Sequence, residues 1–136
     1  MTKIDKWGCR GVSSDLIGLF VYGLLLWASS VFAASVNVLV QSSPLAGSQY
    51  YAVEALWGEM RLGDRLTLVR EPENRYDKRA VRIEWKGHKL GYVPRKNNRL
   101  VAESLDIGEA LEARISKLRD DPDPWQRVEF EIYLAL

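Results

Sequence analysis

The sequence has almost none of the residues on which disulfide frameworks and zinc centres depend. Its 136 residues include a single cysteine, Cys9, and a single histidine, His88. One cysteine forms no disulfide within its chain, and a lone Cys far from a lone His argues against a zinc site. The sequence also has no G-x-x-x-x-G-K-[ST] loop and no H-E-x-x-H motif. We therefore expect no catalytic residues, no cofactor and no metal, with His88 as a surface residue beside a hairpin turn.

One acidic cluster has the composition of a cation site. Asp120, Asp121 and Asp123 lie in a segment that also contains two prolines. Acidic residues spaced by proline in a loop are typically solvated, so we expect these carboxylates to face water and not to bind a metal.

Charge is absent from Leu16 to Val53, and the first part of this stretch is strongly apolar. Leu16–Ala34 reads LIGLFVYGLLLWASSVFAA and follows a slightly basic region. Val31 and Ala33 occupy the −3 and −1 positions of an A-x-A-like cleavage site, which predicts a secretory signal peptide that is removed after Ala33.

Two alternatives to a cleaved signal peptide remain open. The apolar core is nearly long enough to span a bilayer, so residues 16–34 are also compatible with an uncleaved anchor. The second alternative is a start codon assigned too early, so that the real chain begins later. We expect an exported protein, periplasmic or anchored in the inner membrane, and a cytoplasmic one if the start is wrong. We divide the chain into residues 1–33, signal peptide or anchor, and residues 34–136, the folded domain.

The folded domain is formally neutral, but its charge is unevenly distributed. From Ala34 onward there are 16 basic and 16 acidic residues. Residues 61–99 hold 12 basic and 5 acidic residues, whereas residues 100–136 hold 4 basic and 9 acidic residues. This asymmetry indicates either two solvated faces or a basic patch that binds a polyanion.

Alternating apolar residues and turn signals predict a mainly β fold. The loops fall at 42–47, 71–78 and 119–125, and Lys86-Gly87 forms a tight hairpin turn. Residues 52–60 fit a short helix or an irregular crossing. A helix over 97–105 would place Leu100, Val101 and Leu105 near one face. Strands are expected over Ser35–Gln41, Arg65–Arg70, Arg79–Trp85, His88–Val93, Ala110–Leu118 and Arg127–Leu136. About six strands and one short helix predict a small OB-like or SH3-like β-barrel, with Val81, Ile83, Leu90 and Val93 facing its interior.

Cations and tyrosines are concentrated around the loop at 71–78. Aromatic faces beside Arg and Lys suit single-stranded nucleic acid, because bases stack on tyrosine and cations hold phosphate. Asp77 fits a different role, since a carboxylate accepts a hydrogen bond from a sugar hydroxyl. Each tyrosine taken singly also fits a packing role. The residues in question are Arg70, Asn74, Arg75, Tyr76, Asp77 and Arg79, with Tyr92, Arg95 and Lys96 downstream and the adjacent pair Tyr50 and Tyr51 upstream. If Tyr50 and Tyr51 lie on a strand, their rings point to opposite faces.

Two segments of this region resemble the HIRAN domain family. The run LVREPENRYDKRAV at 68–81 and the run KLGYVPR at 89–95 follow the family pattern of R-[ED]-P, N-x-Y-D, an A-[VI] strand and G-Y-[VL]-P. The resemblance extends from about Val38 to the C-terminus. It implies an OB-like barrel and, by similarity to a eukaryotic fork-remodelling member, a site that grips the 3′-hydroxyl end of single-stranded DNA.

The resemblance also implies ligand contacts for particular residues. Tyr50 matches an aromatic residue that stacks on a terminal base, and Gln49 occupies a position held by Arg in the eukaryotic DNA binder. Asn74, Tyr76 and Asp77 match N-x-Y-D, with Tyr76 stacking and Asp77 contacting the 3′-hydroxyl. Tyr92 replaces a His, and Arg95 matches a phosphate-binding Lys. The departures at Gln49 and Tyr92 put end capture in question.

The first functional hypothesis is a non-catalytic module that binds single-stranded DNA or another polyanion. The alternative is an exported or membrane-tethered interaction module for a peptide, a glycan or a partner protein, with residues 16–34 as its membrane contact. An accessory subunit of a partner enzyme is a third possibility. Enzymatic activity in this family is expected in fused ATPase or nuclease domains, and nothing in this sequence supports hydrolase activity.

Overall fold

The computed structural model describes residues 34–136. The predicted signal peptide or anchor and Cys9 lie outside the described residues, and so does the predicted cleavage position at Ala33. Within residues 34–136, no helix is both long enough and apolar enough to cross a bilayer.

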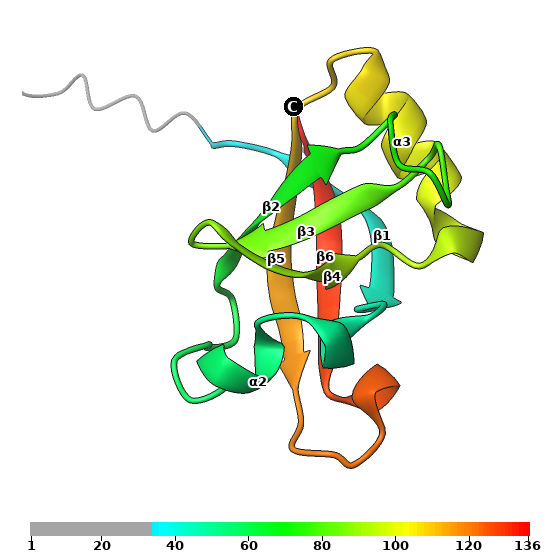
Figure 1. Cartoon of the computed structure of the whole chain (residues 1–136). Helices are drawn as coiled ribbons and strands as arrows, with labels where there is room; N and C mark the ends of the chain where they lie inside the picture. Colours follow the sequence, from blue (N-terminus) through cyan, green and yellow to red (C-terminus); the bar gives the residue numbers. More distant parts are fainter. Residues whose placement is uncertain (1–33) are drawn as a thin grey trace, which may run out of the picture. The chain divides into compact units, whose positions relative to one another are not determined.

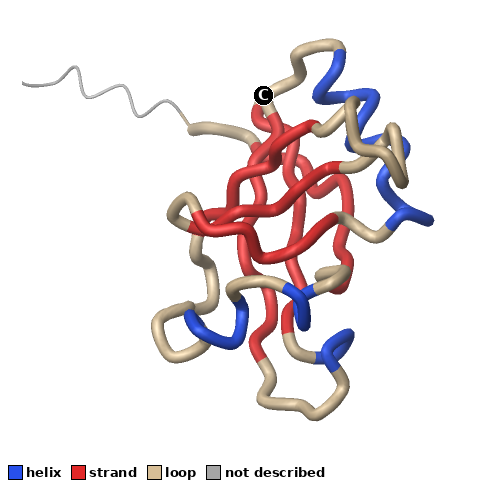
Figure 2. The backbone as a smooth tube through the Cα atoms, viewed as in Figure 1, coloured by secondary structure: helices blue, strands red, loops and turns tan. Residues whose placement is uncertain are grey.

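Six antiparallel strands form one sheet in the order β1-β6-β5-β2-β3-β4. Figures 1 and 2 show the strands curving around a common interior, with helical segments at the periphery. The strands are β1 (Asn37–Pro44), β2 (Arg65–Arg70), β3 (Val81–Trp85), β4 (His88–Tyr92), β5 (Leu111–Leu118) and β6 (Val128–Ala135). The mainly β prediction is confirmed, and the bounds of β2 coincide with the predicted ones.

A single bridge joins the two ends of this strand order. Just after β1, Ala46 pairs with Tyr92 of β4: each donates its backbone N–H to the carbonyl of the other, at 2.9 Å in both directions. The approach is so close that a Cβ on Gly91 would lie 2.4 Å from the carbonyl oxygen of Ala46. Glycine at position 91 is therefore what allows the chain after β1 to reach β4 and close the sheet.

Two α-helices and three 3-10 turns connect the strands. The turn η2 (Ser48–Tyr50) and the one-turn helix α2 (Val53–Leu56) lie between β1 and β2. The turn η3 (Arg95–Asn97) leads directly into α3 (Asn98–Asp106), and η4 (Pro124–Gln126) precedes β6. The predicted helix at 97–105 is confirmed with a shift of one residue.

The hydrophobic core lies inside the curved sheet, and within the described residues 34–136 its members fall between Leu45 and Ile132. The four residues predicted to face inward, Val81, Ile83, Leu90 and Val93, are all buried. Strands, loops and α3 all contribute to this one core. His88 is exposed, as predicted.

Two local predictions are wrong. The segment 42–44 continues β1 instead of forming a loop, because Ser43 and Pro44 pair with β6 and the outer edge of β1 tolerates proline. The condition considered for Tyr50 and Tyr51 does not apply, because they lie at the end of η2 and not on a strand. The second wrong prediction concerns α3. Leu100 is exposed, and α3 buries Val101 and Ala102 in its place.

Candidate functional site

A cavity of about 460 Å³ lies where the chain after β1, the loop after β2 and the end of β4 meet. Seven of its lining residues come from the loop after β2 and from the residues after β4, which carry the sequence motifs. The lining is Ala46, Tyr51, Asn74, Arg75, Tyr76, Asp77, Ala80, Lys89, Tyr92, Val93 and Arg95. We call Asn74–Asp77 together with Arg95 the rim, and we call Tyr51, Lys89 and Tyr92 the wall.

Asn74 fixes the conformation of the rim loop. Its side-chain Oδ1 accepts hydrogen bonds from the backbone N–H groups of Tyr76 at 2.9 Å and Asp77 at 3.1 Å. Asparagine commonly stabilises turns in this way because its short side chain reaches N–H groups two and three residues ahead. The backbone N–H of Asn74 also donates to the carbonyl of Glu71 at 3.1 Å. Asn74 therefore positions its neighbours.

Asp77 is held by the start of α3. Its Oδ2 accepts a hydrogen bond from Nδ2 of Asn98 at 2.7 Å, and its Oδ1 accepts one from the backbone N–H of Arg79 at 2.9 Å. Asn98 is only 2% exposed, so this contact ties the rim loop to the core. Nε of Arg95 lies 4.0 Å from Asp77 Oδ2, a loose ion pair with a side chain that is 78% exposed. The carboxylate is thus oriented and still accessible.

Tyr76 and Arg75 extend from the rim toward solvent. Tyr76 is 80% exposed, and the guanidinium carbon of Arg75 lies 5.9 Å from the centre of its ring. An exposed ring buries little apolar area on folding, so Tyr76 contributes little to the free energy of folding. Its face is available to a flat ligand.

The wall consists of a lysine between two aromatic rings. Nζ of Lys89 lies 4.2 Å from the ring centre of Tyr51 and 4.5 Å from that of Tyr92. It also donates to the hydroxyl of Tyr92 at 2.6 Å, and the two rings meet edge to face with centres 6.0 Å apart. Such cation–π contacts favour the charged amine and fix all three side chains relative to one another.

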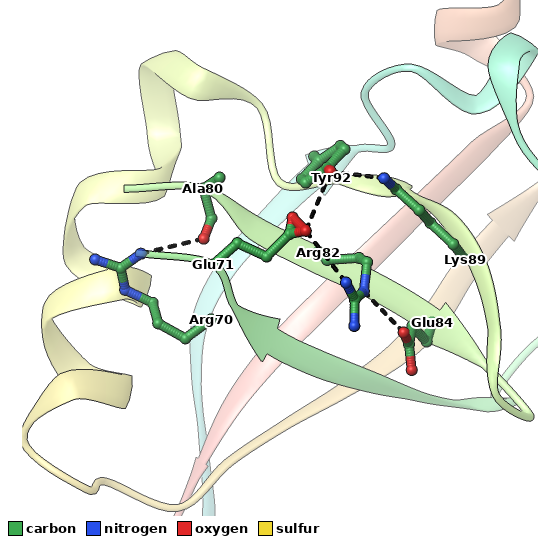
Figure 3. Close-up of polar contacts among 7 residues, drawn as sticks. All are labelled: Arg70, Glu71, Ala80, Arg82, Glu84, Lys89 and Tyr92. Atoms are coloured by element: carbon green, nitrogen blue, oxygen red, sulfur yellow. Dashed lines mark hydrogen bonds and ion pairs between the residues drawn. The ribbon is translucent and has the colours of Figure 1, made fainter. Parts of the chain in front are cut away.

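Behind the wall, a chain of polar contacts continues across β4, β3 and the end of β2 (Figure 3). The Tyr92 hydroxyl donates to Oε1 of Glu71 at 3.4 Å, and Nη1 of Arg82 donates to the same oxygen at 3.1 Å. Nε of Arg82 lies 2.7 Å from Glu84, an ion pair whose angle is poor for a hydrogen bond. The wall is therefore supported by charges that are already paired.

These contacts shift two pKa values. Burial lowers the pKa of Lys89, but its interactions with the hydroxyls of Tyr92 and Tyr51 outweigh burial and raise that pKa above the ordinary 10.5. Burial raises the pKa of Tyr92 above 10.0; the Lys89 ammonium opposes this rise and Glu71 adds to it. At neutral pH the wall therefore presents the charged amine of Lys89 beside the neutral phenol of Tyr92.

A β-bulge explains why Lys89 and Tyr92 share a face. Tyr92 pairs with Arg82, Gly91 with Ile83, and Lys89 with Glu84, so Leu90 has no partner of its own. The extra residue interrupts the strict alternation of sides and brings two residues three apart to the cavity. Regular alternation would have placed them on opposite faces.

The cavity includes some predicted residues and omits others. Asn74, Tyr76, Asp77, Tyr92 and Arg95 line it, whereas Gln49 and Tyr50 do not. Both of the latter are exposed on η2, and Tyr50 is 77% exposed. Their ligand contacts stay a prediction from the resemblance.

Tyr51, Lys89 and Arg75 also line the cavity. Tyr51 and Arg75 belonged to the predicted cluster of cations and tyrosines but not to the contacts that the resemblance implies, and Lys89 belonged to neither. Tyr51 could have been identified from the sequence because it is an aromatic residue next to Tyr50. Arg75 could have been identified because it lies inside the N-x-Y-D motif. Lys89 had no such signal, because the bulge that turns it inward is not visible in a single strand's sequence.

Within residues 34–136, no three His, Cys, Asp or Glu side chains lie close enough together to hold a metal ion. The cations around the cavity differ in their partners. Arg70 pairs with Asp106 at 3.0 Å, and Arg82 pairs with Glu71 and Glu84. In the described part of the chain no carboxylate lies within ion-pair distance of Arg75, Lys78, Arg79 or Lys96. The available positive charge thus lies around the rim.

Comparison with known proteins gave three findings. Residues 38–136 match the family model of the HIRAN domain. The crystal structure of a protein from Lactobacillus plantarum is similar with a TM-score of 0.64 and 27% sequence identity, over 75% of this chain and 98% of that one. The crystal structure of the HIRAN domain of human HLTF is similar with a TM-score of 0.58 and 19% identity, over 73% of this chain and 78% of that one. At that identity the likeness to the human domain concerns the fold alone. The comparison with curated proteins gave no match.

Proposed function

The chain belongs to the HIRAN domain family, and on that premise we propose that it is a non-catalytic module that binds single-stranded nucleic acid, with a 3′-hydroxyl DNA end as its preferred ligand. The observation that carries this proposal is the composition of one cavity. Aromatic faces, cations and one oriented carboxylate meet there within a volume of about 460 Å³.

Each part of the cavity suits one part of a nucleotide. The exposed ring of Tyr76 offers a stacking face for a base, and a stacked base contributes about 1–3 kcal/mol in such sites. Arg75 and Arg95 supply positive charge for phosphate at the rim. Asp77 repels phosphate but accepts a hydrogen bond from a hydroxyl, which is the selectivity that a free 3′ end requires.

The proposal is tested by fluorescence anisotropy of residues 34–136 with labelled single strands that end in a 3′-hydroxyl or a 3′-phosphate. At low salt, where phosphate contacts are strongest, we expect binding of both with a preference for the hydroxyl. Absence of binding to either strand would refute the nucleic-acid function. Equal affinity for the two ends would remove the 3′-hydroxyl preference and retain the general function.

Asp77→Asn separates the two parts of this proposal. The amide keeps the size of the side chain and loses the charge, so the variant should bind the 3′-phosphate strand better than the wild type does. Arg79→Gln is the matched control, because Arg79 is exposed beside the same loop but does not line the cavity. Unchanged end preference in Asp77→Asn would mean that Asp77 does not read the terminal hydroxyl.

We further propose that the protein is exported or tethered, on the basis of the apolar residues 16–34 and the small residues around Ala33. A reporter enzyme that is active only outside the cytoplasm, fused after Ala34, tests this. Activity of the fusion supports export; its absence favours a later start codon and a cytoplasmic protein. The location decides which nucleic acids the cavity can meet.

A further inference from the structure

A second groove lies at the junction of η3 and α3. It has a volume of about 620 Å³ and is lined by residues of β1 and of the η3–α3 junction. The lining is Gln41, Lys96, Asn97, Arg99 and Leu100. Two of these five are cationic, none is acidic, and Leu100 presents an exposed apolar side chain. This composition suits an anionic chain that also carries flat apolar groups.

The two hollows are joined through consecutive residues of one short turn. Arg95 lines the cavity, and the next residue, Lys96, lines the groove. The turn is held in place because the side chain of Asn98, buried at the start of α3, donates to Asp77 at 2.7 Å. The groove is therefore at a fixed position relative to the rim, as a continuous binding path requires.

The positive charge of the groove is available to a ligand. Within residues 34–136, Lys96 has no carboxylate within ion-pair distance. Arg99 pairs with Glu103 one turn along α3 at 3.0 Å, but both side chains are mostly exposed, and such pairs are weak. The groove also contains the first residues of α3, and the side chain of Asn97 makes no capping hydrogen bond there. Uncapped N–H groups add to the attraction for an anion.

We infer that this groove holds the phosphate–sugar backbone of the nucleotides on the 5′ side of the terminal dinucleotide at the cavity, so that affinity rises with strand length. The inference rests on the proposed function and adds a direction to it: the strand leaves the cavity past Arg95 and runs along Lys96 and Arg99. Leu100 would then lie against a base or a sugar of that segment.

The test compares a dinucleotide with a decanucleotide, both with a 3′-hydroxyl, in competition against a labelled strand. For the wild type, the longer strand should bind at least tenfold more tightly. In the double variant Lys96→Gln/Arg99→Gln, most of this gain should disappear, with dinucleotide affinity unchanged. For the decanucleotide, the slope of log K against log salt should become shallower by about 1.4, which corresponds to two lost phosphate contacts on a single strand.

Lys86→Gln/Arg119→Gln is the matched control, since it removes the same charge from two exposed residues that line neither hollow. It should retain the length dependence. If both double variants lose affinity equally, the effect is one of net charge and the groove is not a subsite. If Arg99→Gln weakens α3, Lys96→Gln alone should still make the salt slope shallower, by about half as much as the double variant.

The outcomes distinguish this inference from the proposed function. If the wild type binds both strands with equal affinity, the groove does not bind the strand, and the cavity remains the proposed site. Loss of dinucleotide binding in Lys96→Gln/Arg99→Gln would also overturn it, because the residues would then act within the cavity. Absence of wild-type binding to either strand would overturn both.

Discussion

The wall and the rim of the cavity differ in how many contacts their side chains already make with other parts of the protein. On the wall, Lys89 lies between two tyrosine rings and the Tyr92 hydroxyl contacts both Lys89 and Glu71. On the rim, Tyr76 extends into solvent and Arg95 has one distant partner. The wall therefore resembles a small polar core, and the rim resembles a surface prepared for a ligand. We infer that changes in the wall alter stability and that changes in the rim alter affinity.

The largest expected effect concerns the closure that supports the wall. Gly91→Ala places a Cβ within 2.4 Å of the Ala46 carbonyl, so the backbone must move. We expect the free energy of unfolding to fall by at least about 1–3 kcal/mol, as for other overpacked interiors. Urea unfolding measures this change, and Gly58→Ala is the control, since a Cβ there meets nothing within 4 Å. Similar stabilities for the two variants would mean that closure does not depend on Gly91.

The next largest effect concerns the rim. Tyr76→Ala should lower the affinity for single-stranded DNA by about 1–3 kcal/mol, the usual contribution of a stacked base. Stability should stay within about 0.5 kcal/mol of the wild type, because the ring is 80% exposed. Anisotropy and thermal unfolding measure the two quantities. An unfolded Tyr76→Ala variant would contradict the inference that changes in the rim alter affinity and not stability.

Tyr50→Ala sharpens this result. Tyr50 is about as exposed as Tyr76 but does not line the cavity, so we expect it to lose less affinity than Tyr76→Ala does. Equal losses in the two variants would mean that the ligand extends over η2, where the family resemblance places a contact.

A smaller effect is expected where rim and core are connected. Asn98→Ala removes the hydrogen bond to Asp77 from a buried amide and should cost about 0.5–1.5 kcal/mol of stability. It should also weaken the preference for a 3′-hydroxyl, because the carboxylate loses its orientation. Asn97→Ala is the control for stability, since its side chain makes no capping bond. If Asn98→Ala changes stability alone, Asp77 is positioned by the loop itself.

The smallest effect is a loss of stability at alkaline pH. The folded-state pKa values of Lys89 and Tyr92 lie above their ordinary values of 10.5 and 10.0. A group with a raised pKa stabilises the fold fully below its unfolded pKa and loses that contribution as pH rises through the folded one. Stability should thus be constant with respect to these groups up to about pH 10 and decline above it. Tyr92→Phe, followed by urea unfolding over the same range, should show a smaller decline; an equal decline would assign it to other groups.

Much of this molecule was predictable from local sequence. Alternation within 65–70 and 79–85 depends on residues two apart, which is why β2 and most of β3 were located correctly. The N-x-Y-D pattern identified the rim because Asn74 stabilises its own loop through contacts two and three residues away. Interactions between residues this close in the chain can be recognised from the local sequence.

The errors lie where a distant segment decides the outcome. β1 continues to Pro44 because it pairs with β6, whereas the serines, proline and glycine of residues 42–47 had indicated a loop. Tyr51 reaches the cavity because the Ala46–Tyr92 bridge brings the chain after β1 against β4. Neither contact can be recognised from the residues next to the position that it determines.

The sequence by itself determined a mainly β fold, because strands follow from local periodicity. It also identified Asn74, Tyr76, Asp77 and Arg95 of the rim, because they belong to two short motifs. Only the tertiary structure decided the wall. It turns Lys89 toward Tyr92 through a bulge opposite β3 and selects Tyr51 over Tyr50 through the closure at Gly91. Both choices depend on pairing between strands far apart in the chain, and the free energy of that pairing cannot be read from either strand alone.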